Sequence, residues 1–260
     1  MIVLIAESKT MLAREPEVPL GLLDSCSPCY EAVSSGIMES LRNLSVGELS
    51  AILRLSGSLA AKMHKMIYEF PNKSVGYPAI EAYTGVVFRA LDYASLTEEA
   101  KERCRERVRI ISSLYGWLRP MDIIKPYRLD FTSRLDEGPS AGKALNSFWR
   151  MDVTKALVKI LGDGRQTEIL NLLPSDASKC VDWKLVKRFA RVWKVDFKEI
   201  RENGTMKTPS AERLKSLRGC LLRQILTEDI REAAGLLHTS SDSYVCEGTP
   251  VYPDHLQFLC

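Results

Sequence analysis

Basic and aromatic side chains are concentrated around a glycine and two prolines in residues 113–130. Arg119, Lys125 and Arg128 follow a bend predicted at Gly116, and such a bend between helices leaves backbone N–H groups without helical partners. Free N–H groups beside guanidinium and ammonium groups suit an anionic oxygen, most simply that of a phosphate. The segment therefore indicates a phosphate or nucleic-acid site. The alternative is a buried aromatic helix corner with ordinary surface charges.

A second basic surface is predicted on the long helix that begins near residue 209. Residues 213–227 contain four Arg or Lys residues and no acid. If this helix and the bend are neighbours, their cations line one groove, and each phosphate neutralised there makes binding more salt dependent. Tyr115 and Trp117 would stack on unpaired bases if they are exposed and would fill the core if they are buried. The predicted nucleic-acid-binding residues are Tyr115, Gly116, Trp117, Arg119, Lys125, Arg128, Lys215 and Arg218.

The chain contains none of the common catalytic or phosphate-loop motifs, which include G-x-S-x-G, H-E-x-x-H, G-x-G-x-x-G and the P-loop. Its 3 histidines are scattered, so we predict no metal ligand, no catalytic residue and no cofactor. Among its 7 cysteines only Cys26 and Cys29 form a close pair, and no second pair completes a zinc site. We interpret them as incidental reduced thiols, and a redox sensor is the alternative.

The composition is that of an ordinary globular chain of 260 residues, with 45% hydrophobic and 27% charged residues. A formal net charge of +3 is too small for a bulk polyanion binder, so the local distribution of charge matters more. No apolar run approaches the ~20 residues of a membrane-spanning helix. Residues 1–6 are apolar and are followed at once by Glu7, Ser8 and Lys9, which favours a buried strand over a signal peptide. We therefore expect a cytoplasmic protein with no membrane partner. The sequence makes no prediction about the oligomeric state.

Helices and strands alternate along the chain without a linker that would divide it. Periodicity predicts a first strand over 1–6, a strand over 168–173, and a strand over 192–200 that turns at 202–204. Helices are predicted over 29–43, 45–69, 97–115 and 146–161, and from 209 onward. This order indicates a single mixed α/β body.

Several motifs resemble those of the YaaA peroxide-stress family. Leu114-Tyr-Gly-Trp-Leu-Arg-Pro-Met-Asp122, followed by Pro126-Tyr-Arg-Leu129, is similar to the family signature L-Y-G-x-L-R-P-x-D…P-Y-R-L. Further matches are Lys9-Thr10, Phe148-Trp149, Asn171-Leu172 and Lys215-Ser-Leu-Arg-Gly219. The matches occur in order over nearly the whole chain, so the resemblance is specific.

The resemblance implies a single domain over 1–260, of mixed α/β (α+β) class and unusual topology. In such a domain a helix-hairpin-helix element, here about 97–130, lies beside a positively charged cleft. It also implies binding to DNA, contacted through the phosphate backbone without sequence specificity, and a role in peroxide stress linked to low free iron. The expected partner is distorted, branched or partly single-stranded DNA, and we expect a protein that is not an enzyme.

The chain departs from the family pattern where Tyr83-Thr-Gly-Val-Val-Phe88 replaces F-K-G-D-V-Y. This loss of a lysine, an acid and a tyrosine hydroxyl bears on any small-ligand pocket of the family more than on DNA contacts. The alternative function is an enzyme or binding protein for a small nucleotide-like or phosphorylated ligand. It would use the same cleft, with Lys9 and Tyr83 near the strand ends, where α/β folds place ligands.

Overall fold

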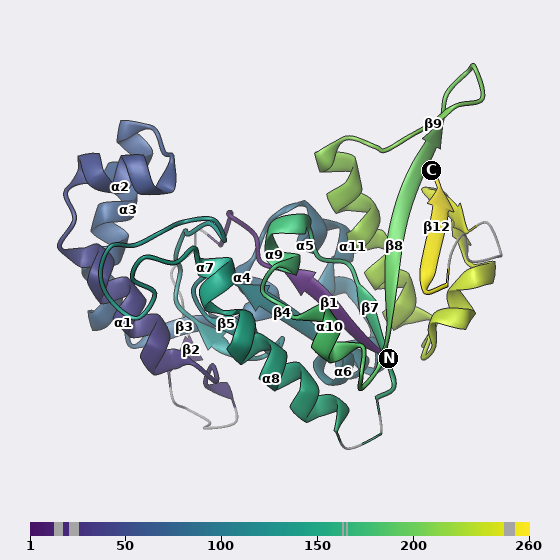
Figure 1. Cartoon of the computed structure of the whole chain (residues 1–260), viewed down its shortest axis with the longest axis horizontal. Helices are drawn as coiled ribbons and strands as arrows, with labels where there is room; N and C mark the ends of the chain where they lie inside the picture. Colours follow the sequence, from purple (N-terminus) through teal and green to yellow (C-terminus); the bar gives the residue numbers. More distant parts are fainter. Residues whose placement is uncertain (13–17, 21–25, 163, 165, 247–252) are drawn as a thin grey trace.

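The computed structural model describes residues 1–12, 18–20, 26–162, 164, 166–246 and 253–260. Its centre is a mixed sheet in the order β10-β11-β12-β8-β7-β1-β4-β5, and β9 pairs with β8 (Figure 1). The parallel strands are β1 (Ile2–Ala6), β4 (Val108–Ser112), β7 (Glu168–Asn171), β8 (Arg191–Ile200) and β12 (His255–Leu259). Antiparallel neighbours are β5 (Gly116–Leu118), β9 (Met206–Lys207), β10 (Ser240–Ser241) and β11 (Tyr244–Cys246). The predicted mixed α/β class is confirmed.

Helices cover this sheet and build a separate lobe at one end of the molecule (Figure 1). The lobe consists of α1 (Glu31–Arg42), α2 (Val46–Leu53) and α3 (Gly57–Glu69). The prediction of one helix over 45–69 is wrong, because Arg54 adopts the left-handed conformation with φ 52° and ends α2. A small sheet of β2 (Val18–Pro19), β3 (Val75–Pro78) and β6 (Ile123–Ile124) lies beside the lobe.

The remaining helices lie between the strands along the chain. They are α4 (Ala79–Ala82), α5 (Val86–Leu91), α6 (Glu98–Arg107), α7 (Leu145–Phe148), α8 (Arg150–Leu161), α9 (Ser175–Ser178), α10 (Trp183–Val186) and α11 (Ala211–Thr227), with 3-10 turns at Phe70–Asn72, Tyr93–Ser95 and Ala233–His238. In the described parts of the chain, no helix combines the length and the apolar character needed to cross a membrane.

The helix-hairpin-helix expected over about 97–130 is not present. The helix predicted over 97–115 ends at Arg107, and the chain continues as β4 and then β5, which form an antiparallel hairpin. The β-branched residues Val108, Ile110 and Ile111 are buried, and the strand that holds them pairs with β1 at the centre of the sheet. Branched side chains lose rotamer freedom in a helix and pack well on a pleated surface, so tertiary pairing overrides the apparent helical stripe.

The bend at Gly116 lies inside the protein. Gly116 has φ +65°, and a Cβ atom there would come within 2.5 Å of the Trp149 ring. Trp149 is fully buried, and its indole N–H donates to the Ser113 carbonyl at 2.8 Å. Only glycine combines this backbone conformation with such close ring packing. The core therefore fixes the shape of this turn, and its backbone is not accessible to a phosphate.

The strand order β4-β1-β7-β8 creates a change of direction at β1 (Figure 1). From β1 the chain reaches β4 on one side, and it later returns past β1 to β7 on the other side. In open α/β sheets, the loops that leave two such neighbouring strands diverge and leave a crevice outside their carboxyl ends. The topology therefore places a crevice after Ala6 of β1 and Asn171 of β7.

Candidate functional site

A hollow of about 220 Å³ occupies this crevice. The segment after β1, the loop after β7, the start of α5, residues 129–131 and helix α11 enclose it. Its walls include buried apolar side chains and exposed charged ones. The lining residues used below are Glu7, Ser8, Lys9, Phe88, Leu129, Asp130, Phe131, Leu172, Asp176, Lys215 and Arg218.

Glu7 is the first residue after β1 and lines the hollow. Its Oε2 atom accepts a hydrogen bond from the Ser113 backbone N–H at 2.9 Å and a short one from the Tyr127 hydroxyl. Burial raises the pKa of the Glu7 carboxyl to about 7, although these hydrogen bonds act in the opposite direction. Both of these hydrogen bonds reach Oε2, and the carboxyl is partly exposed where it lines the hollow.

Buried hydroxyl groups hold the Glu7 carboxyl in place. Because Tyr127 donates its only hydroxyl proton to Glu7, the hydroxyls of Tyr83 and Ser112 donate to Tyr127, at 2.6 Å and 2.7 Å. Burial, and next the charge of Glu7, raise the pKa values of both tyrosines well above their ordinary range. Tyr83 thus lies behind Glu7 and supports it through Tyr127, whereas the sequence predicted it in the pocket itself.

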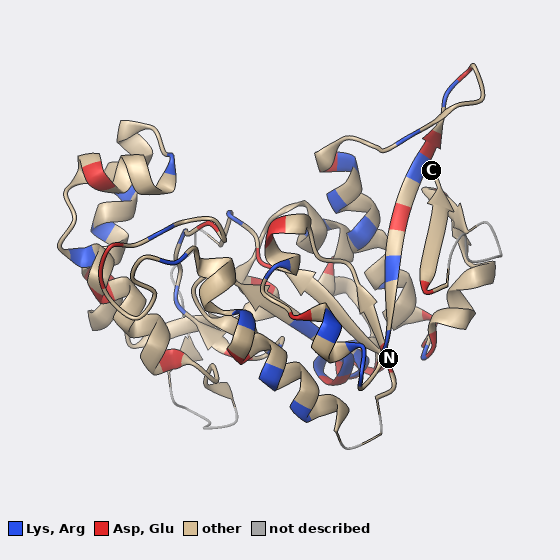
Figure 2. Ribbon diagram, viewed as in Figure 1, with Lys and Arg blue, Asp and Glu red and all other residues tan. Residues whose placement is uncertain are grey.

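Cations reach the hollow from two directions. Lys9, from the segment after β1, is exposed and forms an ion pair of 2.5 Å with Asp130. Lys215 and Arg218 come from α11, along which Figure 2 shows several Lys and Arg positions. Arg218 is partly buried, and burial lowers its pKa. Among the described residues, no carboxylate lies within 4.0 Å of Lys215 or Arg218, and no hydrogen bond satisfies Arg218.

Gly219 allows α11 to bring these cations to the hollow. A Cβ atom at this position would lie 2.3 Å from the Val87 carbonyl oxygen of α5. Both helices therefore approach each other closely, and Val87 and Phe88 of α5 form one wall of the hollow while Lys215 and Arg218 of α11 face it. In the motif Lys215-Ser-Leu-Arg-Gly219, the Lys and Arg residues thus supply the charge, and the glycine permits the close contact between the helices.

The other predicted nucleic-acid-binding residues lie mostly in the core or in internal contacts. Tyr115 and Trp117 are each 3% exposed, so they present no ring face to a base. Lys125 Nζ donates to the Phe70 carbonyl at 2.9 Å, and its pKa is lowered by burial. Arg128 donates to the Lys9 carbonyl at 3.2 Å and thereby ties residues 126–130 to the edge of the hollow. The structure brings together Lys9, Arg128, Lys215 and Arg218 but not the aromatic residues.

Arg119 neutralises a buried acid. Its guanidinium contacts the Asp122 carboxylate at 2.7 Å, and it also donates to the Ser27 carbonyl at 3.0 Å. Asp122 is 1% exposed, and burial raises the pKa of its carboxyl to about 6. This is a structural pairing and gives Arg119 a role independent of any ligand.

We expect Arg119→Ala to lower the free energy of unfolding by about 2 kcal/mol, because it leaves a buried carboxylate without its charged partner. Urea denaturation at pH 7 measures this loss. Arg134→Ala is the control, since Arg134 is exposed and its side chain makes, with the residues that the structure describes, one long hydrogen bond of 3.4 Å to the Gly142 carbonyl. Equal stabilities of the two variants would contradict the assigned role of Arg119.

Sequence reasoning missed Glu7, Ser8, Phe88, Asp130 and Asp176 as residues of the site. A usable signal was the polar run Glu7-Ser-Lys9 directly after an apolar strand, because carboxyl ends of central parallel strands face the crevice. Cys26 and Cys29 form no disulfide with any residue that the structure describes. Within the described residues, no group of three His, Cys, Asp or Glu side chains could hold a metal ion.

The strand order and the charged hollow define an α/β protein whose site lies at the carboxyl edge of its parallel strands. The family model described as "Peroxide stress protein YaaA" matches residues 1–249. The chain is 31% identical over 238 residues to a UPF0246 protein of Parabacteroides distasonis, covering 91% of this chain and 90% of that protein. It is 28% identical over 261 residues to a UPF0246 protein of Bordetella petrii, covering 99% and 98%. The chain belongs to the YaaA peroxide stress protein family.

Proposed function

We propose that this protein binds the sugar–phosphate backbone of DNA in the cytoplasm and thereby limits peroxide damage to it. The observation that supports this most is the pair Lys215 and Arg218, which lies beside the hollow. Among the described residues no carboxylate lies within 4.0 Å of either cation, and Asp176 and Asp196 act on Arg218 only from a greater distance. A partly buried guanidinium has lost part of its hydration, and an anionic oxygen restores the lost interactions. A phosphate is the anionic group that DNA offers at every position along a strand.

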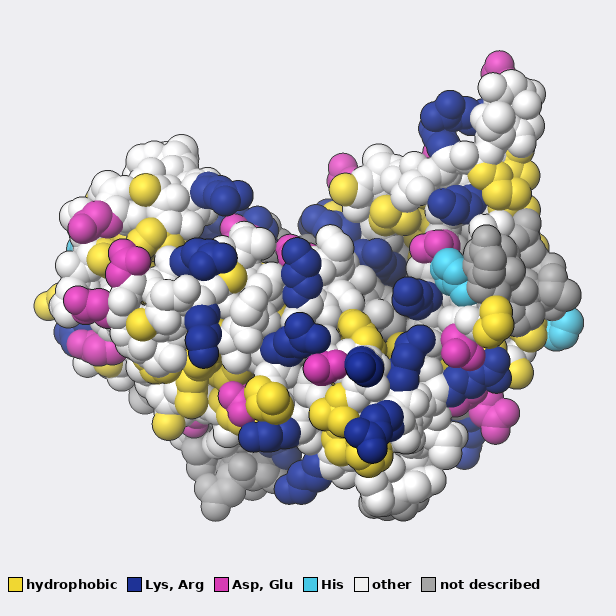
Figure 3. All heavy atoms as spheres, in the orientation of Figure 1, with side chains coloured by type: hydrophobic (Ala, Val, Ile, Leu, Met, Phe, Trp, Pro, Cys, Tyr) yellow, Lys and Arg dark blue, Asp and Glu magenta, His cyan; other side chains and the backbone are white. Residues whose placement is uncertain are grey.

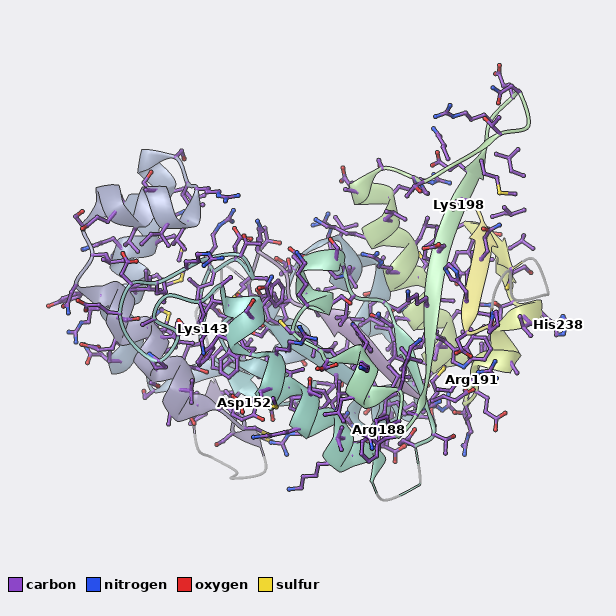
Figure 4. The ribbon with its side chains drawn as sticks, in the orientation of Figure 1. Lys143, Asp152, Arg188, Arg191, Lys198 and His238 are labelled. Atoms are coloured by element: carbon purple, nitrogen blue, oxygen red, sulfur yellow. The ribbon has the colours of Figure 1, made fainter. Side chains whose placement is uncertain are left out.

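The surface around the hollow supports contact with a longer polyanion. Figure 3 shows Lys and Arg side chains across the middle of one face and on both sides of the notch between the α1–α3 lobe and the β8–β9 arm. Among the residues labelled in Figure 4, Lys143 precedes α7, Arg188 follows α10, and Arg191 and Lys198 lie on β8. Lys143 and Arg188 are exposed, and neither has a carboxylate within 4.0 Å among the described residues. A strand could therefore follow this face through several phosphates.

The contact differs from the one that a helix-hairpin-helix would make. The Gly116 turn is buried beneath Trp149, so main-chain amides of the hairpin do not contribute. In the proposed contact, side-chain cations hold the backbone, and these carry no sequence information. Binding is accordingly expected to be non-sequence-specific and steeply dependent on salt.

The variant Lys215→Ala/Arg218→Ala tests the proposal. We expect it to bind a single-stranded oligonucleotide about 30-fold more weakly, which corresponds to about 1 kcal/mol for each phosphate contact. The slope of log affinity against log salt should become shallower by about 1.4 for single-stranded DNA and by about 1.8 for duplex DNA. Fluorescence anisotropy over a salt series measures both quantities, for single-stranded, duplex and bubbled DNA.

Arg213→Ala is the matched control. Arg213 lies on the same helix, but residues two apart on a helix face different sides, and Arg213 is already paired with Glu199 at 3.1 Å. Its removal should change the affinity little. Unchanged affinity and salt slope in the double variant would show that the DNA contact lies elsewhere or does not exist.

The second candidate is binding of a small phosphorylated or nucleotide-like molecule in the same hollow, with or without an enzymatic step. The position of the hollow favours it, because ligands of open α/β sheets bind at the crevice where the strand order changes direction. A thermal-shift screen with nucleotides separates the two functions. Stabilisation by a mononucleotide without any binding to DNA would favour the small-ligand function.

A further inference from the structure

The hollow has a polar floor, apolar walls and a cationic rim. Its deepest residues are the end of β1 and Glu7, since Ile5 is 1% and Ala6 8% exposed. The walls carry the buried apolar side chains of Phe88, Leu129 and Phe131, and also of Leu172. Lys9 and Lys215 are exposed and therefore stand at the opening. From the bottom of the hollow to its opening, a ligand would therefore meet a carboxyl group, then apolar side chains, and then positive charges.

We propose that this hollow receives one nucleotide unit, with its base between the apolar walls, an edge of the base hydrogen-bonded to the Glu7 carboxyl, and its phosphate held by Lys215 and Arg218. This inference rests on the proposed function, because the same cations bind the phosphate. It adds a binding site for the base that is attached to that phosphate. A nucleotide has the required sequence of groups, because a phosphate, two apolar ring faces and a polar base edge follow one another. Neither an inorganic phosphate nor a bare sugar phosphate would use the walls or Glu7.

The size of the hollow limits the occupant to one unit. Its volume of about 220 Å³ is below the roughly 300–1,000 Å³ of pockets that enclose drug-sized ligands. A base within a stacked duplex could not reach Glu7, so a unit that belongs to DNA has to be unstacked or at a strand end, and unstacking has an energetic cost. A free mononucleotide would enter without that cost. The recognised chemistry is the same in both cases.

Glu7 is well placed to recognise the base. Its Oε2 atom is held by the Tyr127 hydroxyl and the Ser113 N–H, which fixes the carboxyl plane, and Tyr83 and Ser112 fix Tyr127 in turn. A fixed carboxyl that lines the hollow forms a directional hydrogen bond to a ring N–H or an exocyclic amino group. Positioning by buried neighbours reduces the entropy lost when the ligand binds.

The first experiment compares the four deoxynucleoside 5′-monophosphates with 2-deoxyribose 5-phosphate by titration calorimetry on the full chain at low salt. We expect at least one nucleotide to bind about tenfold or more tightly than the base-free sugar phosphate, as for a base-edge hydrogen bond. Glu7→Gln should change or remove this preference among bases. Lys215→Ala/Arg218→Ala should weaken the nucleotide and the sugar phosphate by the same factor, and Arg213→Ala should weaken neither.

A second measurement identifies the source of the nucleotide unit. A single-stranded oligonucleotide carrying 2-aminopurine becomes more fluorescent when that base leaves the stack. A rise on binding to the wild-type protein, but a smaller one with Glu7→Gln, assigns the hollow to a nucleotide of the DNA strand. Tight mononucleotide binding without such a rise assigns it to a free nucleotide.

The proposal is overturned if no nucleotide binds more tightly than 2-deoxyribose 5-phosphate in the wild-type protein. That result would leave the DNA-backbone proposal intact, because backbone binding has no base-dependent part. The backbone proposal fails on a different result, namely oligonucleotide affinity and salt slope that do not change in Lys215→Ala/Arg218→Ala.

Discussion

We expect the free energy of unfolding of Glu7→Gln, taken relative to that of the wild-type protein, to increase by about 3 kcal/mol between pH 4 and pH 8. The pKa of Glu7 is about 7 in the folded protein, against an ordinary value of 4.5. Between these two values the folded state keeps the proton that the unfolded chain has released. The wild-type stability due to Glu7 therefore falls as the pH rises through this window and is constant above it.

Glutamine is neutral at every pH and so lacks this dependence. Its side-chain oxygen can still accept the hydrogen bonds from Ser113 and Tyr127. Asp122, whose pKa is also raised, to about 6, affects both proteins alike and cancels from the difference. Urea denaturation of both proteins from pH 4 to pH 8 gives the result, with exposed Glu137→Gln as the control. A constant difference between variant and wild type across this range would show that Glu7 is ionised in the folded protein at pH 5.

Gly219→Ala is expected to destabilise the protein by about 2 kcal/mol. Alanine in a helix interior gains about 1 kcal/mol over glycine from its backbone propensity. This gain is outweighed here, because the new methyl group would lie 2.3 Å from the Val87 carbonyl oxygen and would force α11 and α5 apart, an overpacking cost of about 3 kcal/mol. Thermal or urea unfolding measures the net loss.

The same displacement should weaken DNA binding, since Lys215 and Arg218 move with α11 away from the hollow. Gly57→Ala is the matched control, because no atom lies within 4 Å of the added methyl group at the start of α3. It should leave stability and binding within about 0.5 kcal/mol of the wild type. If Gly219→Ala behaves like Gly57→Ala, the close contact of α11 with α5 does not position the site.

Local patterns predicted several elements well. The apolar run at residues 1–6 is β1, the alternation over 192–200 lies within β8, and the basic helix predicted from 209 is α11 with Ser210 as its N-cap. The residues that indicate each of these elements lie within the element itself or directly beside it in the sequence. The family resemblance was likewise predicted from ordered motifs and is confirmed by the match over residues 1–249.

The segment around Gly116 shows where local reasoning fails. Val108, Ile111 and Tyr115 fit a helical stripe as well as they fit a strand and turn, and helix spacing alone cannot separate the two over such a short run. Residues 108–112 form a strand because they pair with β1, and no pattern within residues 97–115 reveals that pairing. Motif residues 114–122 therefore serve the core, through Gly116 beneath Trp149 and through Arg119 on buried Asp122.

The sequence by itself determined which segments are apolar, where the unneutralised cations of the last helix lie, and to which family the chain belongs, because these properties depend on residue order alone. Only the tertiary structure decided that Glu7, Asp130, Lys215 and Arg218 share one hollow, and that Tyr115 and Trp117 do not. The site joins residues from opposite ends of the chain at a change of strand order. Strand order is set by the burial of the whole core, so it follows from contacts between distant residues and not from any local pattern.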